Sequence, residues 1–364
     1  MHNGTHIPSI RPIPQNGPAP ESTGSAASGD AGSRDTIRSI GTTAEPAALS
    51  ETPLRFRSPW MVAVWPGMGH VATTAGYYLM AHLQMNLFAE FLPKGLFDLG
   101  EIQVRNGLIL PPRLPLSRFF AWRDPSEQHD LIVFIGEAQP PVGTTVFCDR
   151  LIDYARAIGV ERIFTFAAMA TDMHPHRESR VFAAATDAEY LEQLCQKGQV
   201  EVIEDGRIAG MNGTLLASAA ESGLPGCCLL GEMPHLFAGL PYPKASLEVL
   251  RTFESFAHLP LDLAELEEQS RRVDERLGQL LSEVEARMSE RRPPSELEEG
   301  ESPSFLPTTP EERLSALDRT RIEELFREAA ADRSRAYELK AELDRLEVFQ
   351  EYEDRFLDLF KSAE

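Results

Sequence analysis

Two carboxylates lie at positions where layered α/β proteins usually carry their functional residues. Glu137 and Glu232 each follow a glycine at the end of a short apolar run that predicts a buried strand. Ligand sites lie beyond the carboxyl ends of parallel strands, so the two side chains can converge at one edge of a sheet. Paired carboxylates can transfer protons or bind an amine. The alternative, which we favour because no nucleophile or base is visibly paired with either residue, is that each caps the turn or helix that follows.

The loop after the first predicted strand contains a Gly-x-Gly pair. Gly67, Gly69 and His70 lie between a strand at 61–65 and a helix that starts at Val71. A helix N-terminus in this position can hold an anion such as a nucleotide phosphate. However, the third glycine of the dinucleotide-binding fingerprint is missing, and the sequence has no P-loop motif. A tight strand–helix turn is therefore favoured, and no cofactor is expected.

The polar loop 171–177 contains Asp172, His174 and His176. Two histidines at this spacing could share a metal ion, but no cysteine or carboxylate set completes four ligands nearby. The sequence therefore predicts no metal site, and Asp172 is kept as a candidate residue for binding a ligand or a partner.

The stretch 208–234 combines a loop, a helix, a strand and a second loop. Asn212 is expected to cap a helix that begins at Thr214, and Gly223 to end it. The apolar run 227–230 predicts a strand covered on both faces, with its two cysteines buried and structural rather than nucleophilic. Asn212 and Gly213 remain candidates for ligand or partner contacts, because loops of α/β proteins carry function.

These residues are positioned by alternating strands and helices, which predict an α/β layered domain with a mainly parallel or mixed sheet. The predicted strands lie at 61–65, 117–122, 131–135, 162–169, 181–185 and 227–230, and the helices at 71–91, 144–158, 187–197 and 214–222. Asn106-Gly107 predicts a hairpin turn.

The chain divides by composition into five parts. Residues 1–52 are poor in large apolar side chains and are predicted to be disordered. The α/β domain covers 53–260, and a long helix with a narrow apolar stripe, as in a coiled coil, covers 261–290. A Pro-, Glu- and Ser-rich linker at 291–310 precedes an amphipathic helical extension at 311–364, with a break near Asp332.

Charge and hydropathy exclude some partners. The 364 residues contain 35 Lys and Arg against 56 Asp and Glu, for a net charge of −21. This balance argues against binding nucleic acid or an anionic membrane. No apolar run approaches the ~20 residues that cross a bilayer. Without a signal-like segment or a disulfide framework, the expected location is the cytoplasm.

From about Pro59 to Met288 the chain resembles the PAC2 family of proteasome assembly chaperone 2-like proteins. The resemblance is carried by segments that occur in a fixed order: Pro66-Gly-Met-Gly-His-Val71, Leu131-Ile-Val-Phe-Ile-Gly-Glu-Ala-Gln-Pro140, Asp153-Tyr-Ala-Arg-Ala-Ile-Gly-Val160, Ala185-Thr-Asp-Ala-Glu189, Ile208-Ala-Gly-Met-Asn-Gly213 and Cys228-Leu-Leu-Gly-Glu-Met-Pro234. The chain departs from the family at His70, where Asn is usual, and at Ala72, where Gly is common.

The resemblance implies a three-layer α/β/α domain like that of nucleoside phosphorylases, with a helical C-terminal part. It also implies an assembly-chaperone or scaffold role and homo-oligomers. Some archaeal members dock on the proteasome through a C-terminal hydrophobic–Tyr–any residue motif, and the last six residues here, 359–364, lack it.

Two functions are therefore carried forward, beside the possibility that the C-terminal helices are the active part and the α/β domain only presents them. The first is a non-enzymatic, oligomeric protein that acts through protein contacts made by its strand-end loops or its acidic helices. The second is an enzyme or small-molecule binder, for a nucleoside or an amine, at the same strand ends. An enclosed cavity surrounded by Glu137, Asn212 and Glu232 would favour the second.

Overall fold

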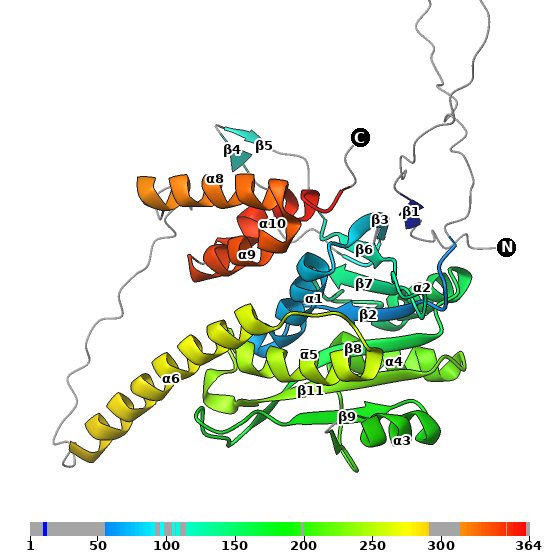
Figure 1. The fold of residues 1–364 in the computed structure, drawn as a ribbon, viewed down its shortest axis with the longest axis horizontal. Coiled ribbons are helices and arrows are strands. Elements are labelled where there is room, and N and C mark those ends of the chain that lie inside the picture. Colours follow the sequence, from blue (N-terminus) through cyan, green and yellow to red (C-terminus); the bar gives the residue numbers. More distant parts are fainter. Residues whose placement is uncertain are drawn as a thin grey trace, which may run out of the picture.

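One mixed sheet organises the chain in the computed structural model, which describes residues 10–12, 55–91, 95–97, 104–105, 107–109, 114–197, 200–290, 314–346 and 348–361 (Figure 1). Within these ranges the sheet has the strand order β1-β3-β6-β7-β2-β8-β11-β9-β10. Its strands are β1 (Ile10–Pro12), β2 (Trp60–Val64), β3 (Asn86–Phe91), β6 (Ser117–Trp122), β7 (Leu131–Gly136), β8 (Arg162–Thr171), β9 (Val181–Ala185), β10 (Glu201–Val202) and β11 (Gly226–Pro234).

The four central strands, β7, β2, β8 and β11, run parallel, and each flank adds an antiparallel neighbour, β6 on one side and β9 on the other. The predicted hairpin is present as a separate pair, β4 (Val104–Arg105) and β5 (Leu108–Ile109). Because the central strands are parallel, their carboxyl ends share one side of the sheet. We call the loops on this side, after β2, β7, β8 and β11, the carboxyl edge.

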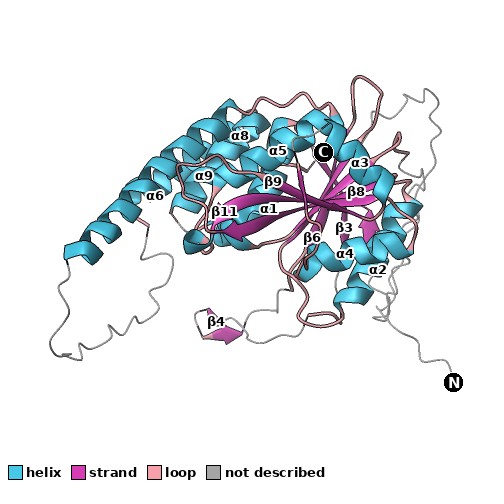
Figure 2. Ribbon diagram, turned by 90° about the horizontal axis from the view of Figure 1, so that it is seen from below, coloured by secondary structure: helices cyan, strands magenta, loops and turns pink. Residues whose placement is uncertain are grey.

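Helices cover both faces of the sheet, as the alternation of side chains along β2 requires. Met61 and Ala63 pack toward α2 (Thr144–Ala157) and α4 (Gly210–Glu221). Val62 and Val64 pack toward α1 (Val71–His82), α3 (Ala188–Lys197) and α5 (Pro243–Ala257). Figure 2 shows the twisted sheet between these two helical layers. The predicted three-layer α/β/α architecture is confirmed.

The helical C-terminal part packs back onto the α1 side. It comprises α6 (Ala264–Glu290) and then α8 (Ala316–Ala331), α9 (Ala336–Arg345) and α10 (Phe349–Asp358). We call residues 314–361 the C-terminal unit. Its apolar residues join the core cluster that contains α1, and Figure 1 shows α9 and α10 beside α1 and β6. Along the long helix α6, Leu266 and Leu277 of the predicted apolar stripe are buried, whereas Leu280, further along, is 46% exposed.

Three sequence predictions need correction. The helix predicted over 71–91 ends at His82, because Gln84 takes a left-handed conformation and the chain turns into β3, which pairs with β6. The helix predicted to begin at Thr214 begins at Gly210. Part of the segment predicted to be disordered, Ile10–Pro12, pairs with β3. The rest of 1–52, apart from these residues, and the linker 291–310 lie outside the described residues.

The backbone of α4 at Gly213 lies very close to the backbone of Ile208. A Cβ atom built on it would lie 2.1 Å from the carbonyl oxygen of Ile208, which is backbone and cannot rotate away. We expect Gly213→Ala to lower the free energy of unfolding by ~1–3 kcal/mol through overpacking, measured by urea denaturation. The matched control is Gly239→Ala, since a Cβ there would meet nothing within 4 Å. Equal stability of the two variants would contradict this close approach.

Candidate functional site at the carboxyl edge

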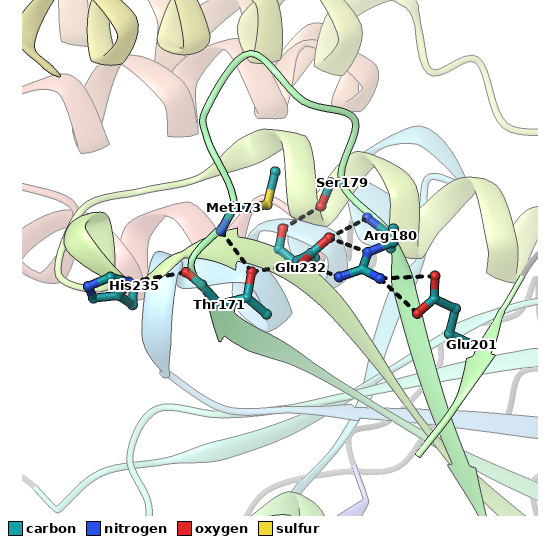
Figure 3. A network of polar contacts seen from close by, with 7 residues as sticks. All are labelled: Thr171, Met173, Ser179, Arg180, Glu201, Glu232 and His235. Carbon is teal, nitrogen blue, oxygen red and sulfur yellow. Dashed lines mark hydrogen bonds and ion pairs between the residues drawn. The ribbon is translucent and has the colours of Figure 1, made fainter. Parts of the chain in front are cut away.

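Glu232 is buried and fully engaged by its neighbours (Figure 3). Arg180 donates from Nη2 to Oε1 at 2.7 Å and from Nε to Oε2 at 2.8 Å. The Thr171 hydroxyl donates to Oε1 at 2.8 Å. The sequence interpretation placed Glu232 in a loop, but β11 runs on to Pro234, so Glu232 lies within the strand and its register against β9 sets the Arg180 contact.

This pairing fixes the charge of both groups. The hydrogen bonds from Arg180 lower the pKa of Glu232, with Thr171 contributing, although burial acts in the opposite direction. The same hydrogen bonds raise the pKa of Arg180, whose guanidinium also pairs with Glu201 at 3.0 Å. Glu232 is therefore an ionised carboxylate held by a fork of donors, and it is not poised to accept a proton near neutral pH.

Glu137 has an equivalent arrangement on the other flank of the parallel strands. Its Oε1 accepts from Nη1 of Arg118 at 2.7 Å, and its Oε2 accepts from the backbone N–H of Leu116 at 2.9 Å. Arg118, 5% exposed at its side chain, also pairs with Asp354 at 2.8 Å and lies 3.9 Å from Glu90. Burial alone would lower the pKa of Arg118, but these carboxylates raise it above its ordinary value.

The two carboxylates do not converge. β2 and β8 lie between β7 and β11, so at ~4.8 Å per strand Glu137 and Glu232 are separated by ~14 Å. Each is instead paired with an arginine from the antiparallel strand beside it, Arg118 from β6 and Arg180 just before β9. The convergence that the sequence left possible does not occur, because strand order inserts two strands between them.

The Gly-x-Gly loop after β2 is hydrogen-bonded to the loop that follows β11. Gly69, at φ +60°, donates its N–H to the carbonyl of Ala238 at 3.0 Å and accepts from the N–H of Tyr242 at 2.8 Å. A Cβ at Gly69 would lie 2.7 Å from the sulfur of Met233. Gly67 has extended backbone and open space around it, so its glycine is not required by packing.

His70 faces the C-terminal unit from the end of this loop. Partial burial lowers the pKa of His70, and the ammonium of Lys340 on α9 adds to the effect, whereas Asp344 opposes it. His70 has φ +52° and stands at the N-cap of α1 without a side-chain capping bond. The loop therefore fits the tight-turn interpretation, and its neighbours are protein groups.

Of the remaining candidates, Asp172 lies after β8, whereas Asn212 and Gly213 are adjacent on α4. Asp172 is 98% exposed at its side chain and its Oδ1 lies 3.1 Å from Nδ1 of His235. Asn212 was expected to cap a helix, but Ala209 is the N-cap of α4 and Asn212 sits inside the first turn, with a buried Oδ1 that has no partner among the described residues. Gly213 is fixed by its approach to Ile208.

The structure places side by side two loops that carry exposed apolar side chains, which the sequence interpretation missed. Met68, Leu236 and Leu240 are exposed by 47%, 65% and 47%, and we call them the apolar face. The bonds of Gly69 to Ala238 and Tyr242 hold their two loops side by side. An apolar run just after a strand, Leu236-Phe-Ala-Gly-Leu240, is the signal that could have indicated them.

Hollows of about 360 and 490 Å³ are present among the described residues, and Glu137, Asn212 and Glu232 line neither of these. The first lies between α5 and α6, and its Lys244 is already bound by Asp274 and by the carbonyls of Pro175 and Arg177. No group of three or more His, Cys, Asp or Glu side chains in the described ranges is arranged to hold a metal ion. Nor does any described helix combine the length and the apolar character needed to cross a membrane.

With this geometry established, comparison with known proteins assigns the family. The sequence model of the PAC2 family matches residues 61–281, well over half of the chain. The chain belongs to the PAC2 family. An uncharacterized protein of Methanocaldococcus jannaschii is 25% identical over 241 residues, which are 64% of this chain and 87% of that protein.

Solved structures agree with the family. PbaB of Pyrococcus furiosus, an archaeal proteasome activator, is 28% identical with a TM-score of 0.53, over 62% of this chain and 94% of that one. A PAC2 family protein from Streptomyces avermitilis is 24% identical with a TM-score of 0.53, over 61% and 95% of the two chains, which shows the shared fold. The C-terminal unit lies beyond the residues matched by the family model.

The pairing of Glu232 with Arg180 predicts a pH-dependent variant. The pKa of Glu232 is lower in the folded protein than in the unfolded chain, where it is about 4.5. Glu232 therefore stabilises the fold at pH values above 4.5, and this contribution is lost as the pH falls through the folded-state pKa. In Arg180→Met the buried carboxylate loses its cation and its pKa rises. We expect the variant's deficit in urea midpoint to be largest near pH 7 and to shrink toward pH 4.

The control for this prediction is Arg271→Met, which removes a guanidinium paired with Glu268 and Glu275 on the exposed side of α6. We expect a small effect of this change at every pH, because exposed ion pairs contribute little. If the deficit of Arg180→Met were the same from pH 4 to pH 8, the Glu232 charge would not be its cause.

Proposed function

We propose that this PAC2-family protein is non-enzymatic and chaperone-like, binding other proteins and copies of itself through the carboxyl edge. The observation that carries the proposal is the apolar face of Met68, Leu236 and Leu240. Three large apolar side chains on loops tied by backbone hydrogen bonds form a preordered surface, and exposed apolar clusters of this kind serve protein contacts.

The ionised carboxylates support the same proposal. Glu137 and Glu232 are each paired with an arginine, so both carboxylates at the strand ends are hydrogen-bonded rather than a free acid or base. The likeness to an archaeal proteasome activator, at 28% identity, adds weight to a protein-binding role. We expect the protein to act in the cytoplasm as an assembly chaperone or as an oligomeric scaffold.

A triple variant, Met68→Ser with Leu236→Ser and Leu240→Ser, tests the apolar face. The matched control is Val104→Ser with Leu108→Ser and Ile109→Ser, which removes three apolar side chains, exposed by 64%, 70% and 72%, from the separate hairpin β4–β5. Mass is measured by size-exclusion chromatography with light scattering at ~100 µM, a concentration at which contacts of ~5–6 kcal/mol are populated.

We expect the wild type and the control to exceed the 40.4 kDa of one chain and the face variant to associate at least about tenfold more weakly. Burying one Leu or Met side chain contributes ~1.5–3 kcal/mol, so losing three exceeds the ~1.4 kcal/mol of a tenfold change. A monomeric wild type would remove the oligomer part of the proposal. Partner capture is compared by affinity purification from native lysate. If the wild type and the face variant captured partners equally, the apolar face would not be the binding surface.

A further inference from the structure

The surface beneath the C-terminal unit has the features of a helix-docking site. It consists of the outer side of α1 with parts of β3 and β6. The ring of Tyr77 meets Phe349 and Phe356 edge-on at centroid distances of 5.2 and 5.6 Å. Beside it, Tyr78 meets Tyr337 at 4.6 Å. Aromatic pairs in this geometry add to the stability that burial alone provides.

Polar contacts fix the register of the unit on this surface. Nη2 of Arg118 on β6 donates to Asp354 at 2.8 Å, and the Tyr77 hydroxyl donates to Glu353 at 2.8 Å. Both acceptors lie on α10, between its anchors Phe349 and Phe356. The body therefore recognises an acidic amphipathic helix: aromatic side chains seven residues apart fill the apolar contacts, and two carboxylates between them meet a buried arginine and a tyrosine.

The unit is also organised within itself. Ser315 and Asp318 form a reciprocal capping box at the start of α8. Arg355 of α10 pairs with Glu323 of α8 at 2.5 and 2.7 Å, and Arg321 pairs with Glu338 of α9 at 3.1 Å. These contacts close α8, α9 and α10 on one another without help from the sheet.

The covalent connection between body and unit is the segment 291–313. The family model ends at residue 281, so the unit follows a domain that other chains form without this extension. A fully extended segment of this length spans at most ~80 Å, enough to reach either the surface of its own chain or that of a neighbour. Tethering keeps the local concentration of the unit high without making it part of the sheet.

We propose that the C-terminal unit is a tethered ligand of the α1–β6 surface, bound non-covalently and exchangeable between copies of the chain. This surface recognises an acidic, aromatic-anchored helix, and residues 314–361 are its resident occupant. It is separate from the apolar face, so this proposal does not depend on the function proposed above.

The test uses the full chain with a protease recognition sequence introduced within 291–310. The protein is prepared in unlabelled and ¹⁵N-labelled forms, cut after folding, mixed at ~10 µM and followed by native mass spectrometry. We expect each cut protein to remain a complex of body and unit, and bodies of one label to acquire units of the other, whereas in uncut protein every body and its tethered unit keep the same label. The mixing is repeated at increasing denaturant concentrations. If no body acquires a unit of the other label below the concentration at which the body itself unfolds, the unit is an integral part of the core and the proposal is overturned.

Asp354→Asn sharpens the test, because it removes the charge that meets Arg118 and leaves the arginine paired with Glu137. We expect exchange at least about fivefold faster. The matched control is Glu323→Gln, the same change within the unit at a carboxylate paired to Arg355 of the unit itself. Equal exchange of these two variants would overturn the recognition by Arg118. The apolar-face variant should exchange like the wild type, which separates this result from the proposed function.

Discussion

Helix α1 imposes the main constraint on this structure, because every residue from Val71 to Ala81 is buried. A helix without an exposed side needs cover all round. The sheet covers one side, and α5 and the C-terminal unit cover the rest. Two tyrosine hydroxyls of α1 bind the covering segments: Tyr78 donates to the carbonyl of Asp262 ahead of α6, and Tyr77 donates to Glu353 of α10. A buried hydroxyl without a partner would cost ~1–3 kcal/mol, so these bonds select the covering elements as well as stabilising them.

The charged groups follow a second rule, set by strand direction. Each flank of the parallel strands is closed by an antiparallel neighbour, and each neighbour supplies an arginine to a carboxylate at the carboxyl edge. Arg180 also reaches Glu201 on the next strand, and Arg118 reaches Asp354 on α10. The carboxylates that could have been catalytic thus link the sheet to its surroundings. Their depth makes the pairing obligatory, since an unpaired buried charge is strongly destabilising.

The molecule consequently presents two different surfaces. The apolar face is open and held by backbone hydrogen bonds between the loop after β2 and the loop after β11. The outer side of α1 is filled by the chain's own helices through aromatic contacts and two charged side chains. A PAC2 fold with this extension can therefore keep one apolar surface exposed while a segment of the same chain occupies another.

The sequence by itself determined the family, the alternation of strands and helices, and the buried strand that contains both adjacent cysteines, because these depend on local pattern and on short segments in fixed order. It also indicated the break near Asp332, where the side chain accepts from the N–H of Ser334. Only the tertiary structure decided where the carboxylates lie, since strand order separates Glu137 from Glu232 and supplies each with an arginine distant in sequence. It also turned 86–91 from helix to strand, because pairing with β6 outweighs local propensity. The partners of the Tyr78 and Tyr77 hydroxyls likewise lie 184 and 276 positions away, which no local pattern encodes.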